Sequence, residues 1–191
     1  MSVVATDTEI SEEEIVALIR GAQRNDREAF DRIYALYADR IFRYLYYRLG
    51  DRQQAEDLAA DVFVRLLEKV RTFRPGPKDQ VAIFSGWLYR IAHNLLVDHL
   101  RKQARGKQEP LDSVPLSHSQ TPDLAVEATL QWEQLRRALP HLTEDQQRVI
   151  LFRFIEGMRT KEVADTMDKT EGAIKALQHR ALSALQRHLR E

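Results

Sequence analysis

Five polar or charged residues near the middle of the sequence recur in steps of 4, 4, 3 and 4: Arg90, Asn94, Asp98, Arg101 and Arg105. Side chains at these spacings lie on one side of a helix, so the pattern predicts a single stripe. Guanidinium groups bind phosphates, and a mid-helix asparagine, a poor helix former, offers an amide for a base edge. Trp87, just before the stripe, is expected in the core. The whole stripe favours binding to nucleic acid with unstacked bases.

A second set of polar side chains lies on the last predicted helix, which runs from Thr170 to about Leu189. A short helix is predicted for 160–167, and Asp168-Lys169 leaves room only for a tight turn between the two. This is the helix-turn-helix arrangement, whose second helix enters the major groove of DNA. From the pattern alone, a solvated helix face and a DNA-binding face are equally supported. The candidate contacts are Thr170, Gly172, Lys175, Gln178, His179 and Arg180.

An acidic set lies on the most strongly amphipathic predicted helix, at 51–70. Asp57 and Asp61 are one turn apart on its polar side, and Arg65 lies four residues beyond Asp61, where it would offset part of their repulsion. Like charges at this spacing cost an isolated helix about 0.2–0.5 kcal/mol. The set is either an acidic surface for a basic partner or a solvated face with local pairing. By pattern alone, the solvated face is favoured.

The residues that support catalysis or metal binding in other proteins form no such pattern here. The six histidines are scattered, without a pair at the one-turn spacing of a helical metal site. The chain lacks cysteine, and its glycines do not form a phosphate-binding loop. We therefore expect a protein that is not an enzyme and that has no catalytic residues, no metal and no cofactor.

Helical signals run through the whole sequence. Capping boxes are predicted at 11–14, 25–28 and 143–146, and Gly50-Asp51 ends one helix and begins the next. A further helix is predicted from about Ser85 to Arg105. Period-two alternation is absent, so the expected fold is all-α. Apolar residues expected to face the core include Tyr34, Leu67, Leu95, Leu177 and Leu182.

The glycines and prolines divide the chain. The stretch 106–123 holds three of the six prolines and three serines, which is typical of a flexible linker. We expect two small helical domains joined by this linker. The predicted divisions are an N-terminal segment at 1–24, a first domain at 25–105, the linker at 106–128 and a second domain at 129–191.

The overall charge is zero, with 29 basic and 29 acidic residues among 191. Neutrality taken alone argues against a nucleic-acid ligand, but the charge is unevenly distributed. Residues 84–107 hold five bases and one acid, whereas residues 1–30 hold seven acids and three bases. No apolar run is long enough to span a bilayer, and the acidic N-terminus is unlike a signal peptide. A cytoplasmic protein without membrane insertion is expected.

Three motifs together resemble the extracytoplasmic-function (ECF, group 4) sigma factors of bacterial RNA polymerase, within the sigma-70 family. Gly50-Asp51 with Ala55-Glu56-Asp57-Leu58 and Asp61-Val62-Phe63 is similar to region 2.2 of that family. The segment 87–94, WLYRIAHN, with Asp98 and Arg101 is similar to regions 2.3 and 2.4. Leu139-Pro140, Gln147-Arg148-Val149, Glu156-Gly157, Glu162-Val163-Ala164 and Gly172-Ala173-Ile174-Lys175 resemble region 4.

The resemblance implies roles for these residues. Asp57 and Asp61, with Arg65, would contact the β′ clamp helices of core RNA polymerase, while region 4 would meet the β flap. The stripe around Asn94 would bind the unpaired −10 strand, and the last helix would read the −35 element in duplex DNA. An anti-sigma factor is implied as a further partner.

Two other classes of function are compatible with part of this pattern. A regulator that binds duplex DNA without polymerase would share the helix-turn-helix, but it would leave the stripe at 90–105 unexplained. A helical adaptor without a DNA role would explain neither feature.

Overall fold

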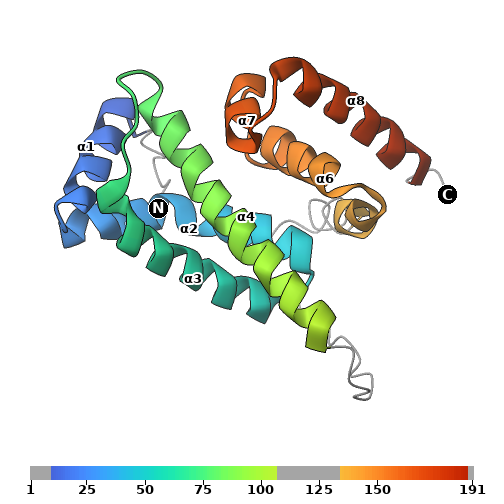
Figure 1. Ribbon diagram of the computed structural model, residues 1–191, viewed down its shortest axis with the longest axis horizontal. Coiled ribbons are helices and arrows are strands. Elements are labelled where there is room, and N and C mark those ends of the chain that lie inside the picture. The colour runs from blue at the N-terminus through green and yellow to red at the C-terminus, as the bar shows by residue number, and fades with distance from the viewer. Residues whose placement is uncertain (1–9, 107–133, 189–191) are drawn as a thin grey trace, which may run out of the picture.

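The computed structural model describes residues 10–106 and 134–188. Within these ranges the chain consists of helices and their connecting turns, without strands. Figure 1 shows two groups of helices, α1 to α4 and α6 to α8, with α4 beside α7. The all-α fold with two helical units, expected from the sequence, is confirmed. The predicted linker lies outside the described residues, apart from Gly106 at the end of α4.

The first unit begins with three helices whose ends are fixed by local chemistry. They are α1 (Glu12–Gln23), α2 (Arg27–Leu49) and α3 (Arg52–Lys69), which continues into a single 3-10 turn, η1 (Val70–Thr72). The capping box at Ser11 forms as predicted. Gly50 ends α2 with φ +70°, where glycine is favoured, and the Asp51 side chain accepts from the Gln54 amide to begin α3.

The predicted cap at Asn25 is wrong. Asn25 has φ +63° and closes the turn after α1, while the Asp26 carboxylate accepts from the amides of Glu28 and Ala29 to begin α2. Asparagine tolerates left-handed backbone, and aspartate suits an N-cap, so each residue occupies a position that its side chain favours. Sequence spacing alone did not separate these two roles.

Helix α4 (Gln80–Gly106) is the longest helix described and borders both units (Figure 1). It begins five residues before the predicted start at Ser85, and in its first turn the amide of Ile83 donates to the carbonyl of Asp79. Leu88, Ala92 and Leu96 face the core. Leu95, which was expected there, is only partly buried.

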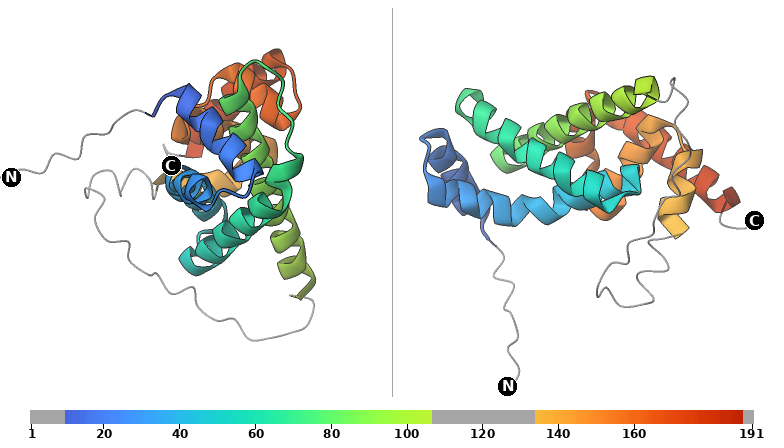
Figure 2. Two further views of the ribbon diagram at one scale, coloured as in Figure 1. Left: turned by 90° about the vertical axis from the view of Figure 1, so that its left-hand side faces the viewer. Right: turned by 90° about the horizontal axis from the view of Figure 1, so that it is seen from below.

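The second unit is built from shorter helices. After a helical turn at 134–138 come η2 (Leu139–His141), α6 (Glu144–Ile150), a π-helical segment η3 (Leu151–Ile155), α7 (Thr160–Met167) and α8 (Glu171–His188). The capping box at Thr143 forms as predicted, and Pro140 lies inside η2. Asp168, at φ +55°, makes the tight turn between α7 and α8. Figure 2 shows the two units from two further directions.

One hydrophobic core runs through both units. Tyr44 of α2 stacks on Phe152 of η3 with ring centroids 5.4 Å apart, and Tyr89 of α4 meets both rings edge-on. Three residues expected in the core are instead exposed: Tyr34 at 49%, Leu67 at 52% and Leu182 at 37%. They lie at the edges of the apolar helix faces, where periodicity does not define the extent of burial.

His93 of α4 makes the stability of the fold depend on pH. Burial lowers the pKa of His93 to about 4, with Arg148 and Arg48 acting in the same direction. Asp145 acts in the opposite direction but is outweighed. The unfolded chain, with an ordinary histidine pKa near 6.5, binds the proton more readily, so this stability is present above pH 6.5 and is lost as pH falls towards 4.

We expect acidification from pH 7 to pH 4 to remove at most roughly 3 kcal/mol of unfolding free energy through His93 alone. Denaturant unfolding at a series of pH values measures this loss, with His93→Gln as the comparison. The variant should have a flatter profile over that pH range. An identical pH profile in the two proteins would mean that His93 is not the responsible group.

Candidate nucleic-acid interface

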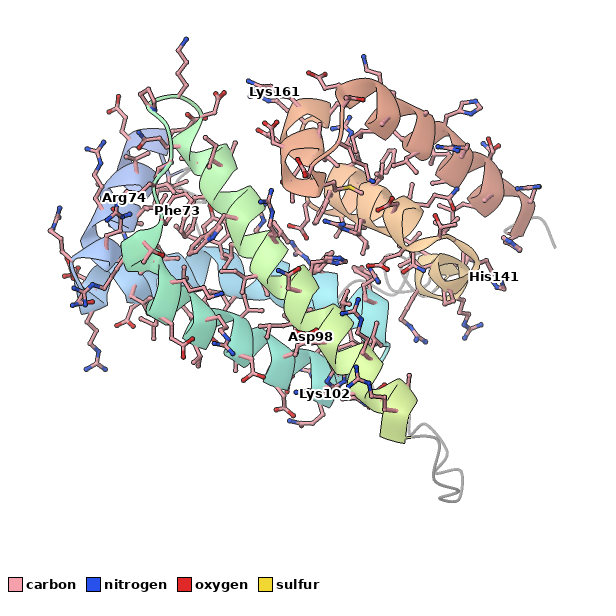
Figure 3. All side chains as sticks on the ribbon, viewed as in Figure 1. Phe73, Arg74, Asp98, Lys102, His141 and Lys161 are labelled. Carbon is pink, nitrogen blue, oxygen red and sulfur yellow. The ribbon has the colours of Figure 1, made fainter. Side chains whose placement is uncertain are left out.

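The stripe predicted on α4 is exposed along its whole length. Arg90, Asn94, Asp98, Arg101 and Arg105 all face away from the core, and Figure 3 shows Asp98 with Lys102 on the outer side of the helix. Arg101 and Asp98 form a loose, exposed ion pair at 3.9 Å. The Asn94 side chain has no structural role in the core. The helix therefore presents hydrogen-bonding and cationic groups to solvent in one line.

A polar cluster anchors the second half of α4 to α3. The side-chain oxygen Oε1 of Gln54 lies 2.9 Å from His99 Nε2 and accepts from Gln103 Nε2 at 2.6 Å. Gln54 itself lies in the first turn of α3, with its backbone amide held by Asp51 at 2.9 Å. These bonds fix the rotation of α4 against α3 and so hold the stripe outward.

Trp87 packs at the first half of α4. Its ring lies 4.8 Å from that of Phe73 and 5.9 Å from that of Phe84, and the side chain is partly buried against the core. Arg90, one turn on, donates from Nη2 to the carbonyl of Asp165 in α7 at 3.0 Å. This end of the stripe is therefore engaged by the second unit.

The polar face predicted on α8 is present with one exception. Thr170, Gly172, Lys175, His179 and Arg180 are exposed. The Thr170 hydroxyl accepts from the Ala173 amide at 3.2 Å and caps the helix. Gln178 is half-buried, and its oxygen accepts from Arg153 Nε at 3.4 Å. Since Gln178 supports its own domain, it is a weaker candidate for a base contact than its neighbours.

The acidic set on α3 is exposed, and its internal pairing differs from the prediction. Asp57, Asp61 and Arg65 all face solvent. Arg65 was expected to offset Asp61, but its guanidinium pairs with Glu68 at 2.8 Å. Asp57 accepts from the Gln53 amide at 3.0 Å. Asp61 thus keeps its charge available on the surface.

An exposed apolar row beside these acids was missed by the sequence reasoning. Ala60, Val64 and Leu67 follow one another along α3 next to Asp61, with Val64 54% and Leu67 52% exposed. Helical periodicity had assigned Leu67 to the core. The available signal was the width of the apolar face of α3, which is too broad for one buried stripe.

The described residues were also searched for a metal site and for a membrane-spanning helix. Within residues 10–106 and 134–188, no three histidine or carboxylate side chains converge as metal ligands would. In the same part of the chain, no helix combines the length and apolarity needed to cross a bilayer.

Comparison with known proteins identifies both units. Residues 33–106 match the family model for Sigma-70 region 2, and residues 132–185 match that for Sigma-70, region 4. SigX of Bacillus subtilis, an ECF RNA polymerase sigma factor, is 32% identical over 168 residues, which cover 85% of this chain and 84% of SigX. The chain belongs to the ECF sigma factor family.

Other relatives agree with this membership. BldN, an ECF RNA polymerase sigma factor of Streptomyces coelicolor, is 36% identical over 178 residues, and the match covers 92% of this chain and 66% of BldN. Region 2 of this ECF sigma factor contains α2 from Ile33 to α4, and region 4 contains α6 to α8.

Two solved structures share the fold of this ECF sigma factor. CnrH, in complex with the cytosolic domain of CnrY, gives a TM-score of 0.68 at 20% identity and covers 91% of this chain and 95% of that one. The sigma factor RpoE from Bartonella quintana, in complex with the anti-sigma factor NepR, gives 0.63 at 22% identity, covering 84% and 96%. The likeness extends over both helical units.

Proposed function

We propose that this sigma factor binds core RNA polymerase through α3, captures the melted −10 strand along α4 and reads the −35 element with α8. The observation that carries the proposal is the exposed line of Arg90, Asn94, Asp98, Arg101 and Arg105 on a helix whose other side is fixed to the core. A rigid helix with an amide among guanidinium groups offers hydrogen bonds to unpaired bases and charge to their phosphates. Duplex DNA alone would not require such a line next to a separate helix-turn-helix.

The acidic face of α3 supports the assignment to polymerase binding. Asp57 and Asp61 carry charge on the surface, and Val64 and Leu67 add apolar area beside them. Exposed apolar side chains rimmed by charge are typical of a protein interface. We assign this surface, with Arg65, to the β′ clamp helices, and we assign the β flap to region 4.

The remaining assignments follow from family membership. The polymerase supplies catalysis, and this chain contributes promoter choice in the cytoplasm. An anti-sigma factor is a further proposed partner, since the solved relatives include a sigma factor with its anti-sigma factor. The division into 1–24, 25–105, 106–128 and 129–191 stays a prediction, and α1 adds Leu18, Ile19 and Ala22 to the core of the first unit.

Transcription in vitro tests the proposal. Sigma-free core polymerase with this chain should produce transcripts with fixed start sites from a library of genomic fragments of the source bacterium. Binding of the chain to duplex DNA without any polymerase-dependent start would support the regulator that acts alone. An absence of DNA binding, both free and with polymerase, would support the helical adaptor.

Lys175 on α8 provides a narrower test of DNA contact. If its exposed ammonium group binds a phosphate, Lys175→Ala should lower duplex affinity and reduce the slope of log affinity against log salt by about 0.9. Fluorescence anisotropy with a mixed-sequence duplex at several salt concentrations measures the slope. Arg187→Ala, which removes an equal charge from the last turn of α8, should leave the slope unchanged. If the slope for Lys175→Ala equals that of the native chain, Lys175 does not contact a phosphate.

A further inference from the structure

A hollow of about 320 Å³ lies between α1 and the segment that joins η1 to α4. Three exposed arginines line it: Arg20 from the last turn of α1, Arg71 from η1 and Arg74 from the loop that follows. No aspartate or glutamate is among the described residues of its wall. All of these wall residues belong to the first unit, so this arginine hollow does not depend on the second unit.

The three arginines have no carboxylate partner in the part of the chain that the structure describes. On α1, the residues one helical turn from Arg20 carry no negative charge. The acid one turn before Arg71 is Glu68, whose carboxylate already pairs with Arg65 at 2.8 Å. Like charges repel one another, so a hollow lined by cations without a counter-charge becomes more stable when an anion binds.

Hydrogen bonds fix the wall of the arginine hollow in the free protein. Gln23 Nε2 on α1 donates to the Phe73 carbonyl at 2.7 Å, which ties the loop to α1. Arg74 Nη1 donates to the carbonyls of Arg71 at 2.6 Å and Phe73 at 2.9 Å. A guanidinium has five N–H donors, so Arg74 is held in place through one nitrogen and keeps its other donors for a ligand.

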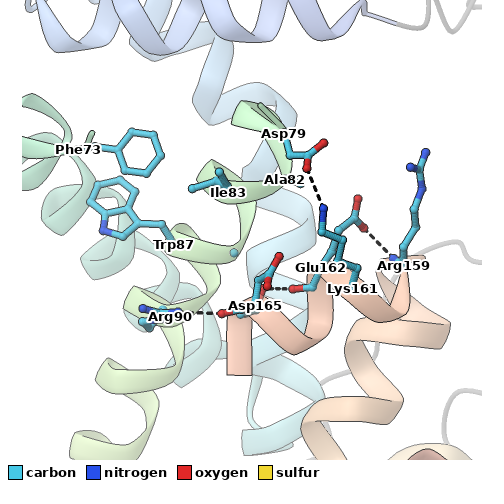
Figure 4. Close-up of a pocket in the computed structure, with 12 residues that line it drawn as sticks. Phe73, Asp79, Ala82, Ile83, Trp87, Arg90, Arg159, Lys161, Glu162 and Asp165 are labelled. Atoms are coloured by element: carbon cyan, nitrogen blue, oxygen red, sulfur yellow. Dashed lines mark hydrogen bonds and ion pairs between the residues drawn. The ribbon is translucent and has the colours of Figure 1, made fainter. Parts of the chain in front are cut away.

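Phe73 joins the arginine hollow to the stripe on α4. Its ring is 7% exposed and packs on Trp87 with the ring centroids 4.8 Å apart (Figure 4). Phe73 also forms part of a second cavity, of about 400 Å³, which Trp87 and Arg90 line at the first half of α4. Because Phe73 belongs to both walls, the arginine hollow is adjacent to one end of the stripe.

Phosphate is the anion that these groups suit best. A guanidinium is planar and forms paired hydrogen bonds with phosphate oxygens. Proteins that hold single-stranded nucleic acid combine aromatic rings, on which bases stack, with a cationic groove that follows the backbone. Trp87 and the arginine hollow supply these two parts side by side. An acidic peptide would match the charge of the hollow but would make no use of the aromatic ring beside it.

We propose that the arginine hollow binds backbone phosphates of the unpaired −10 strand where that strand continues past Trp87. The inference rests on the proposed function, in which the strand lies along α4. It extends the DNA contact to Arg20 on α1, outside the residues 33–106 that match Sigma-70 region 2. Phosphate contacts carry no base information, so the hollow adds affinity for the melted strand without adding sequence preference.

The side of the strand that reaches the hollow follows from the two halves of α4. Trp87 places an aromatic ring at the first half, whereas Arg101 and Arg105 place cations on the second half. Stacking needs unpaired bases, and cations alone suffice for a paired backbone. The duplex that leads to the −35 element therefore lies towards Arg105. The unpaired strand that leads to the start site passes Trp87 and meets the arginine hollow.

The salt dependence of oligonucleotide binding tests this site. The probe is a single-stranded −10 oligonucleotide extended by four nucleotides towards the start site, bound to the chain with core polymerase. Arg20→Ala and Arg71→Ala should each lower its affinity by roughly two- to fivefold. Each should also reduce the slope of log affinity against log salt by about 0.7, the value for one phosphate of a single strand. Arg20→Lys keeps the charge and should keep the slope.

Arg24→Ala is the matched control for these variants. It removes an exposed arginine one turn beyond Arg20 that lines a different hollow, and its slope should equal that of the native chain. With an oligonucleotide that lacks the extension, Arg20→Ala should bind as the native chain does. Native slopes for both Arg20→Ala and Arg71→Ala on the extended oligonucleotide would overturn the proposal.

Nuclear magnetic resonance of the free chain distinguishes failure of this inference from failure of the proposed function. The Nε–Hε signals of Arg20 and Arg71 should shift when a thymidine tetranucleotide is added, and should shift less with inorganic phosphate at the same phosphate concentration. Unshifted signals, or equal shifts with the two ligands, would overturn a site for strand phosphates, the second result in favour of a free anion. Shifted signals in a chain that, with polymerase, binds no −10 oligonucleotide would contradict the proposed function and leave the phosphate site standing.

Discussion

Replacing Asn94 with alanine is expected to lower promoter opening by about 10- to 100-fold while leaving polymerase binding intact. The Asn94 side chain is exposed in the middle of α4. Hydrogen bonding and stacking contribute about 1–3 kcal/mol per base in nucleic-acid complexes, and about 1.4 kcal/mol corresponds to tenfold. The loss should therefore fall on capture of the unpaired −10 strand, because the fold does not depend on this amide.

Affinity for a single-stranded −10 oligonucleotide, measured with polymerase present, gives the effect directly. Gln186→Ala is the matched control, since it deletes an exposed amide of the same kind on α8, outside the candidate contacts. Its affinity for the oligonucleotide should equal that of the native chain. If Asn94→Ala binds the oligonucleotide as tightly as the native chain does, Asn94 does not contact the −10 strand.

Reversing the charge of Asp61 should weaken binding to core polymerase by about tenfold or more, or about 1.4 kcal/mol. Asp61 is exposed and, with Arg65 paired to Glu68, keeps its charge free for a basic partner. Asp61→Lys converts attraction into repulsion at that point, and the association rate should become less dependent on salt. Stability should change by less than about 0.5 kcal/mol, as is usual for exposed positions.

Surface-immobilised core polymerase allows the binding rates to be measured. Glu13→Lys makes the same change in charge on α1, away from the acidic set of α3, and should leave the affinity unchanged. Thermal unfolding of both variants checks that each is folded. Equal polymerase affinity for Asp61→Lys and Glu13→Lys would contradict the assignment of the acidic face.

Local signals predicted most element boundaries in this chain. Gly50, Asp51 and Thr143 fix helix ends through their own backbone or side-chain chemistry, and the structure places them as expected. The predicted start of α4 was wrong: the helix begins at Gln80, five residues before Ser85, with the amide of Ile83 bonded to the carbonyl of Asp79. Asn25 and Asp26 could not be separated because both residue types cap helices.

Exposure of the candidate side chains followed from helix periodicity, but their partners did not. The stripe on α4 is exposed as predicted. Arg65 pairs with Glu68 and not with Asp61, and the sequence could not decide between the two because both carboxylates lie one helical turn from Arg65. Leu67 has an apolar side chain at a helical position that fits a core, and only the position of α2 beside α3 determines that it stays exposed.

The contacts between the two helical units could not be predicted from the sequence. Tyr89 and Phe152 fit ordinary apolar helix faces, and Glu156 fits a motif before Gly157. Nothing in their spacing indicates that Glu156 would meet Arg40, which lies 116 positions earlier in the chain. Contacts between separate domains depend on shape at both surfaces, as at Gly86 and Thr166, and a single helical period does not encode them.

Permanganate reactivity of promoter thymines tests the central claim most directly, because permanganate modifies unpaired thymines. With core polymerase and this chain, thymines in the −10 region of a cognate promoter should become reactive, and Asn94→Ala should reduce that reactivity at least tenfold. A promoter that is occupied by the complex but whose −10 thymines stay unreactive would contradict capture of melted DNA by α4.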